Sequence, residues 1–143
     1  MSTNNVLAVK EKVQRYLVDV LGTIEVDSDG DFTFRHGSAR LFVSVVPMGE
    51  TATFVMLMAI TNRDVPASLE LYKYVATEAH SMFGHLECDE KNGKVTVRLL
   101  HNFLGEFLDP DELQFAVGIL AETADEIDDQ IVARFGGRRF HED

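Results

Sequence analysis

Residues 39–60, ARLFVSVVPMGETATFVMLMAI, decide the fold of this chain. The stretch divides into two apolar runs around Pro47-Met48-Gly49-Glu50, which predicts two antiparallel strands joined by a turn. The second run, residues 54–60, is apolar at odd and even positions alike. A strand with one face in water alternates apolar and polar residues. The pattern therefore indicates a central strand covered on both faces, by the chain's own helices or by another chain.

The composition is that of one globular domain. The chain has 143 residues, of which 45% are hydrophobic and 26% are charged, and this length is enough for a substantial hydrophobic core. The net charge of −11 argues against a nucleic-acid partner, which requires clustered Lys and Arg side chains. It also argues against docking to anionic membranes.

The single cysteine, Cys88, excludes an internal disulfide and favours a reducing compartment. The first residues lack the basic and apolar regions of a signal peptide. No segment approaches the roughly 18 apolar residues that a membrane helix needs. We therefore expect a cytoplasmic protein with no membrane partner.

Helical and strand periodicities alternate along the rest of the chain. Residues 6–21 have helical spacing, residues 23–26 and 31–35 alternate as a first strand or small hairpin, and Ser68 begins a second helix that Gly84 ends. A second β pair is predicted around Asn92-Gly93, because this dipeptide is the strongest short signal for a hairpin turn.

A third helix begins with Asp109 as its cap and Pro110 in the first position, and we expect it to reach Gly136-Gly137, roughly 26 residues later. Its apolar residues form a seam that Phe115 and Ile119 widen near the start. The seam contains Leu113, Val117, Leu120, Ala124, Ile127 and Ile131. Such a long helix is expected to overshoot a small sheet, so its far end should pack on the first helix or on a partner.

Together these elements predict an α+β fold with the order α-β-β-β-α-β-β-α. No linker, repeat or low-complexity block interrupts the order. We therefore expect a single domain over residues 1–137, followed by a mobile tail over residues 138–143.

No pattern in the sequence predicts a catalytic or metal site. Residues 27–31, DSDGD, place glycine at position four, whereas a calcium-binding EF-hand loop needs it at position six. His80, His85 and Cys88 lack the spacing of a metal site, and no nucleophile elbow or phosphate loop is present. We expect no enzyme, metal or cofactor. A pocket joining His36, His80 or His101 to carboxylates would instead favour a small-molecule enzyme.

Acidic residues are concentrated in the last third of the chain. Residues 106–135 carry nine Asp and Glu side chains against Arg134 alone. This charge favours either solubility or a basic partner. The alternative function is therefore a structural or regulatory subunit that docks a basic partner through an acidic helix. The docking residues would be Glu122, Asp125, Glu126, Asp128 and Asp129.

Several motifs resemble those of the YbjN-like proteins of actinobacteria, which are related to the type III secretion chaperones. They are residues 36–43 (HGSARLFV), 64–66 (DVP), 104–113 (LGEFLDPDEL), 124–129 (ADEIDD) and 133–137 (ARFGG). The resemblance implies a curved antiparallel sheet with packed helices, commonly dimeric, that holds peptide segments of partner proteins. It carries no catalytic residues, and we do not transfer a role in secretion.

The main hypothesis is therefore a non-enzymatic chaperone-like module that binds a peptide or protein client and forms a homodimer. Methionines such as Met56 and Met58 either fill the core or line an adaptable binding surface. The predicted peptide-binding residues lie in the two strands of residues 39–60, and because the sequence leaves the registers of these strands open, we expect some of them to point into the core instead. The predicted residues are Arg40, Phe42, Ser44, Val46, Phe54, Met56 and Met58.

Overall fold

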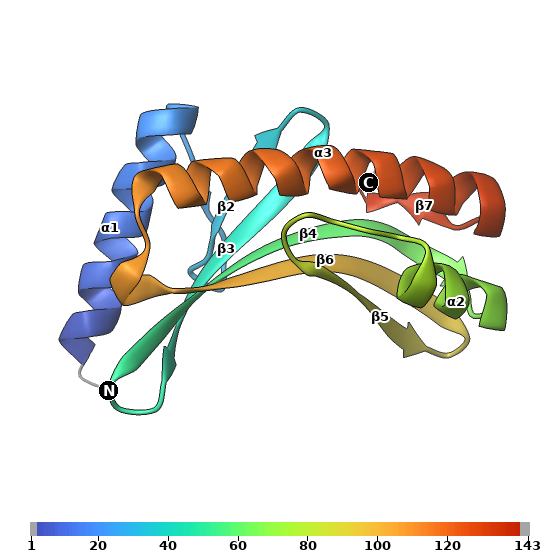
Figure 1. The fold of residues 1–143 in the computed structure, drawn as a ribbon, viewed down its shortest axis with the longest axis horizontal. Helices are drawn as coiled ribbons and strands as arrows, with labels where there is room; N and C mark the ends of the chain where they lie inside the picture. Colours follow the sequence, from blue (N-terminus) through green and yellow to red (C-terminus); the bar gives the residue numbers. More distant parts are fainter. Residues whose placement is uncertain (1–2, 141–143) are drawn as a thin grey trace.

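The strands of one antiparallel sheet lie in the order β1-β2-β3-β4-β6-β5, and β7 pairs with β4 (Figure 1). The computed structural model describes residues 3–140. The strands are β1 Glu25–Val26, β2 Phe32–His36, β3 Ala39–Met48, β4 Ala52–Pro66, β5 His85–Lys91, β6 Lys94–Leu104 and β7 Arg138–Arg139. The sheet is open and curved, which confirms the predicted α+β class.

Three α-helices pack on this sheet, and they are α1 Thr3–Leu21, α2 Leu69–Thr77 and α3 Pro110–Phe135. A short 3₁₀ turn, η1, spans Gly105–Phe107 and precedes α3. Figure 1 shows α1 at one end of the elongated molecule, α2 at the other, and α3 running between them. The predicted element order is confirmed. Of the two alternatives for residues 23–35, the small hairpin is the one formed, by β1 and β2, and the two-residue strand β7 is an addition.

The hairpin of β3 and β4 has the register of an uninterrupted antiparallel ladder, from Leu41 opposite Ala59 to Met48 opposite Ala52. Alternate residues of both strands are buried in the core, among them Val43 and Leu57, which have no exposed surface. Successive side chains of a strand point to opposite faces. The residues between the buried ones therefore lie on the other face of the sheet.

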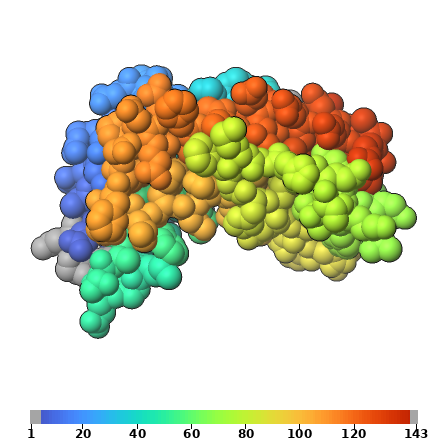
Figure 2. Space-filling view, viewed as in Figure 1, coloured from blue at the N-terminus to red at the C-terminus, as the bar shows by residue number. Residues whose placement is uncertain are grey.

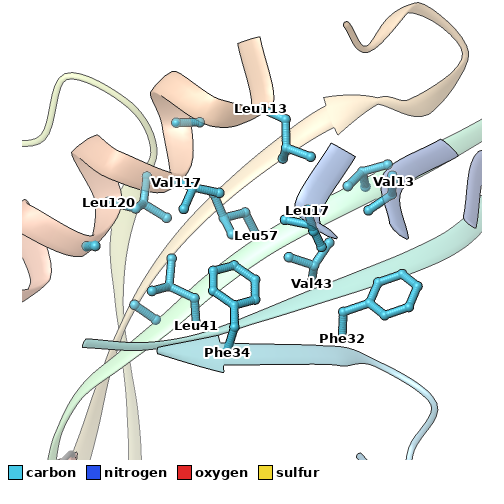
Figure 3. Close-up of a cluster of buried hydrophobic side chains, with 14 of the residues drawn as sticks. Val13, Leu17, Phe32, Phe34, Leu41, Val43, Leu57, Leu113, Val117 and Leu120 are labelled. Carbon is cyan, nitrogen blue, oxygen red and sulfur yellow. The ribbon is translucent and has the colours of Figure 1, made fainter. Parts of the chain in front are cut away.

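The main core lies between the sheet and the helices α1 and α3. Figure 3 shows side chains from five elements directed toward one another in this layer. They are Val13 and Leu17 of α1, Phe32 and Phe34 of β2, Leu41 and Val43 of β3, Leu57 of β4, and Leu113, Val117 and Leu120 of α3. Both helices thus cover the same face of the sheet.

The far half of α3 packs in a second core cluster. Ile127 and Ile131 contact Leu71 and Tyr74 of α2 together with Val65, Val95 and Val97 of the sheet. The expectation that this end would reach the first helix or a partner is wrong. The reason is that β4 and β6 have 15 and 11 residues, so the sheet extends far enough to support the whole helix. The predicted apolar seam is buried along its full length, but Phe115 is 67% exposed and does not widen it.

The second helix is shorter than expected, because α2 ends at Thr77 rather than before Gly84. The backbone N–H groups of Glu78 and Ala79 both donate to the carbonyl oxygen of Tyr74, at 2.9 Å each, and this closes the helix. Phe83 then packs beside strand β6, with its ring centroid 5.2 Å from that of His101. This contact, rather than helical periodicity, determines the path of residues 78–84.

The expected mobile tail is also corrected in part. Arg138 and Arg139 form strand β7, opposite Arg63 and Asn62 of β4, and Phe140 packs against Phe42. The remaining predicted tail residues, 141–143, lie outside the described residues. Strand β3 pairs with β4 only as far as Ala59, so the same side of β4 can pair with Arg138 and Arg139 at Asn62 and Arg63.

Two glycines with the same backbone conformation test how tightly residues 78–84 pack on β6. Gly84 and Gly22 have φ angles of +83° and +84°, but only at Gly84 would an added Cβ overlap a backbone atom, the oxygen of Leu100. We expect Gly22→Ala to lower the free energy of unfolding by about 1–2 kcal/mol through backbone strain. Gly84→Ala should lower it by about 1–3 kcal/mol more through overpacking. Urea denaturation measures both, and equal losses would contradict the packing of Gly84 on β6.

Candidate functional site

All seven predicted peptide-binding residues lie on the same face of the sheet, so the expectation that some of them point into the core is wrong. They occupy the alternate positions of β3 and β4 that point away from α1 and α3. The register places Phe42 opposite Met58, Ser44 opposite Met56, and Val46 opposite Phe54, and Arg40 lies at the end of this row. We call the surface formed by these seven residues the open face.

The open face is apolar, and no helix covers it among residues 3–140. In this part of the chain, helices cover only the other face. The central strand was predicted to be covered on both faces, and the described residues provide the helical cover of one of them. Six of the seven side chains are half-buried by one another and by their neighbours, and Val46 is 41% exposed. Arg40 is the charged residue of the open face, and its guanidinium donates a hydrogen bond to the Thr33 hydroxyl at 3.0 Å.

Strand β6 extends this surface in a way that the sequence analysis did not predict. Leu100 lies opposite Met58, and Leu104 lies opposite Phe54. Leu100 is only 7% exposed, whereas Leu104 is 49% exposed. Their alternation with Leu99 and Phe103 was visible in the sequence, but the pairing of β6 with β4 depends on long-range contacts.

The C-terminal segment also reaches the open face. The ring of Phe140 lies edge-on to Phe42, with 6.2 Å between centroids. The guanidinium of Arg63 lies 4.4 Å from the centroid of the Phe140 ring, within the range of a cation–π contact. One of the seven residues is therefore already in contact with another part of the same chain.

The five predicted acidic docking residues do not form one accessible surface. Asp128 is 3% exposed, and Arg139 of β7 lies 2.7 Å from Asp129 and 3.5 Å from Asp128. Asp125 accepts a hydrogen bond from the Ser38 hydroxyl at 2.5 Å. Glu122 and Glu126 are exposed on the surface of α3. The burial of Asp128 could have been predicted, because it lies four residues after Ala124 and three before Ile131, on the apolar seam.

Burial raises the pKa of Asp128 to about 7, with added repulsion from the carboxylates of Asp129 and Asp125, and Arg139 acts in the opposite direction. A carboxyl group that is removed from water and surrounded by like charge favours its neutral form. Asp128 therefore titrates near neutral pH in the folded chain, beside the strand that carries Arg139.

A groove of about 580 Å³ lies between the end of α1, the turn after β2 and helix α3. His36 shares its lining with Glu122 and Asp125, but the walls are mainly apolar, including Val20 and Phe115. His80 does not line this groove, and His101 lies elsewhere, between the rings of Phe83 and Phe103. Burial lowers the pKa of His101. Of the three histidines, His36 therefore shares a groove with two carboxylates, in an open and mainly apolar setting.

Within the described part of the chain, no cluster of three or more His, Cys, Asp or Glu side chains has the arrangement of a metal site. Cys88 is half-buried, and burial raises the pKa of its thiol, which is opposite to the activation of a nucleophilic cysteine. Residues 3–140 also contain no helix that is both long and apolar enough to cross a membrane.

Residues 8–143 match the family described as T3SS (YopN, CesT) and YbjN peptide-binding chaperone 1, and the chain belongs to this family. The match confirms the resemblance seen in the sequence motifs, and it extends over most of the chain. Comparison with curated proteins gave no match. A peptide-binding, chaperone-like role is therefore a property of the family to which this chain belongs.

The buried carboxyl of Asp128 predicts an unusual pH dependence of stability. Because its pKa is raised to about 7 in the folded chain, the folded state binds more protons than the unfolded state above about pH 4. Its contribution to stability is complete at low pH and is lost as pH rises through 7. Relative to Asp128→Asn, the wild type should lose roughly 2 kcal/mol of unfolding free energy between pH 5 and pH 7.

Urea denaturation across this pH range measures the difference. The matched control is Glu126→Gln, which neutralises an exposed carboxylate of the same helix and should leave the slope nearly that of the wild type. Parallel curves for the wild type and Asp128→Asn would contradict the raised pKa of Asp128.

Proposed function

We propose that this peptide-binding chaperone holds an apolar segment of a client protein against the open face of its sheet, without catalysis. The observation that carries the proposal is the placement of all seven residues of the open face on one side of the sheet, the side that no helix covers within residues 3–140. Five of these seven side chains are apolar, and a partner that covers them would remove their remaining exposed surface from water.

The chemistry of the open face suits a client whose sequence varies. Met56 and Met58 lie in its centre, and methionine adapts to differently shaped apolar groups. Phe42 and Phe54 add large aromatic surfaces on either side of the Ser44–Met56 pair, one from each strand. The backbone groups of β4 in this region are already paired with β3 and β6, so recognition there depends on side chains.

The finer features of the proposal concern assembly and location. We propose a cytoplasmic homodimer, supported by the resemblance and by the apolar pattern of residues 54–60 on both faces. The alternative, docking of a basic partner through α3, has less support because Asp128 is buried and Asp129 contacts Arg139.

The homodimer is tested by light scattering on the purified chain. The chain has a mass of 16.0 kDa, so a dimer should give about twice that value at micromolar concentration, and the value should persist at high salt because an apolar interface is screened little. A single-chain mass across the concentration range would contradict the dimer.

Substitutions of phenylalanine and methionine, each with a matched control, test the open face. Peptides of 12 residues displayed on phage are first selected on the wild type, and the affinity of one enriched synthetic peptide is then measured by fluorescence anisotropy. We expect Phe42→Asp and Met56→Asp each to weaken this peptide at least about tenfold, because each puts a charge into an apolar contact.

Phe107→Asp and Met82→Asp are the controls, since these side chains are 80% and 82% exposed and lie outside the open face. They should leave the affinity unchanged. Thermal unfolding of all four variants checks that the fold is retained. Equal affinities in all four variants, or no peptide enriched on the wild type, would contradict the proposal.

A further inference from the structure

We infer that the side of β4 beyond its ladder with β3, at Asn62–Asp64, is a binding site for an extended peptide with two basic residues followed by an aromatic one. The chain's own Arg138–Phe140 segment occupies this site when no client is bound. The inference rests on the proposed function and adds to it: it names a second region of contact, next to the open face, and the chemistry of the client that fits it.

The site exists because β4 is irregular and longer than its neighbour. Its ladder with β3 ends at Ala59, and its register with β6 shifts at Asn62 and again before Val65. Such bulges bend a strand and change the direction of its side chains. The side of β4 that β3 leaves unpaired is where Arg138 and Arg139 add as β7. Addition of an extended segment to a free strand side is a common mode of peptide recognition.

Acidic side chains lie on two sides of this part of β4, and Arg63 of the strand itself stacks on Phe140. Arg138 lies 2.8 Å from the carboxylate of Asp64, and Arg139 contacts Asp129 and Asp128 on α3. Acidic groups thus approach the segment from both β4 and α3, so that two consecutive basic residues each find an acidic partner. This complementarity defines the two basic positions of the proposed ligand.

The third position is aromatic because of its place at the border of the open face. Phe140 follows Arg139 directly and lies between the ring of Phe42 and the guanidinium of Arg63. Phe42 is one of the seven residues proposed to bind the client. A client that extends across the open face to its Phe42 end therefore meets Phe140 and must either pack on it or replace it.

The intramolecular contact is arranged to be reversible. The ladder between β7 and β4 involves two residues, and the ion pair of Arg138 with Asp64 is about half exposed, so its strength is limited by water. The segment follows Gly136 and Gly137, both with positive φ, and an added Cβ at Gly137 would lie 2.8 Å from the backbone oxygen of Arg63. The two glycines therefore bring the segment to β4, where a two-residue ladder and a half-exposed ion pair help to hold it.

The test uses a peptide copied from residues 136–140, Gly-Gly-Arg-Arg-Phe with an amidated C-terminus, titrated into the full-length chain and followed by amide chemical shifts in NMR. In the wild type the covalently attached segment acts at an effective concentration in the millimolar range. The variant Arg138→Ala/Phe140→Ala removes two of the three side chains of the segment and keeps Arg139 with its contacts to Asp128 and Asp129.

We expect saturable binding to this variant, with shifts centred on Asn62, Arg63 and Phe42, and at least tenfold weaker binding to the wild type. The peptide Gly-Gly-Glu-Glu-Phe should not bind. Adding Asp64→Asn to the variant should weaken the basic peptide, because one acidic partner is lost. Absence of binding to a folded variant, equal binding to variant and wild type, or equal binding of the two peptides would overturn the inference.

A separate outcome distinguishes exchange between copies. If the purified wild type is a dimer and Phe140→Ala converts it to a monomer, then the segment serves a second copy, and the assignment to a client is overturned. Failure of the proposed function would be recognised independently. In that case the phage-selected peptide would bind Phe42→Asp and Met56→Asp as tightly as the wild type, whatever the result with Gly-Gly-Arg-Arg-Phe.

Discussion

The two-residue period of β3 and β4 is the constraint on which the rest of the structure depends. The odd positions Leu41 and Val43 are in the core, and the even positions Phe42 and Ser44 are on the open face. A shift of one residue in register would exchange the two sets. Stability and recognition therefore use alternate residues of the same strands, and because both sets are largely apolar, the register is held by packing of the odd set against α1 and α3.

Helix α3 connects the two parts of the core. Its first half packs with α1 over β2 and β3, and its second half packs with α2 over β4 and β6. One 26-residue helix thus spans both clusters and limits how far the curved sheet can flex between them. Figure 2 shows the result as an arched molecule, with α1 and the turn after β3 at one end and α2 at the other.

Local patterns predicted most of the fold. Asp109 caps α3 by accepting from the Glu112 N–H at 2.8 Å, and Asn92 and Gly93 adopt the positive φ angles of a tight hairpin turn. These features depend on neighbouring residues and were predictable. The early end of α2 and the docking of β7 were not, because each depends on contacts between residues distant in sequence, such as Phe83 with His101 and Phe140 with Phe42.

The open face was predictable only in part. The spacing of the seven residues shows that the members from each strand share one face, but the face that the helices cover is decided by the packing of α1 and α3. The acidic residues of α3 show the opposite case. Charge alone suggested one exposed surface, whereas the apolar seam takes Asp128 into the interior and β7 brings Arg139 to it.

Strand β7 also has a consequence for the behaviour of the chain in concentrated solution. An unpaired strand side next to an apolar sheet face is a template for edge-to-edge association and aggregation. Arg138 and Arg139 pair with the side of β4 that β3 does not reach, and their side chains form ion pairs there with Asp64 and Asp129. This two-residue strand therefore occupies backbone groups of β4 through which another chain could otherwise pair.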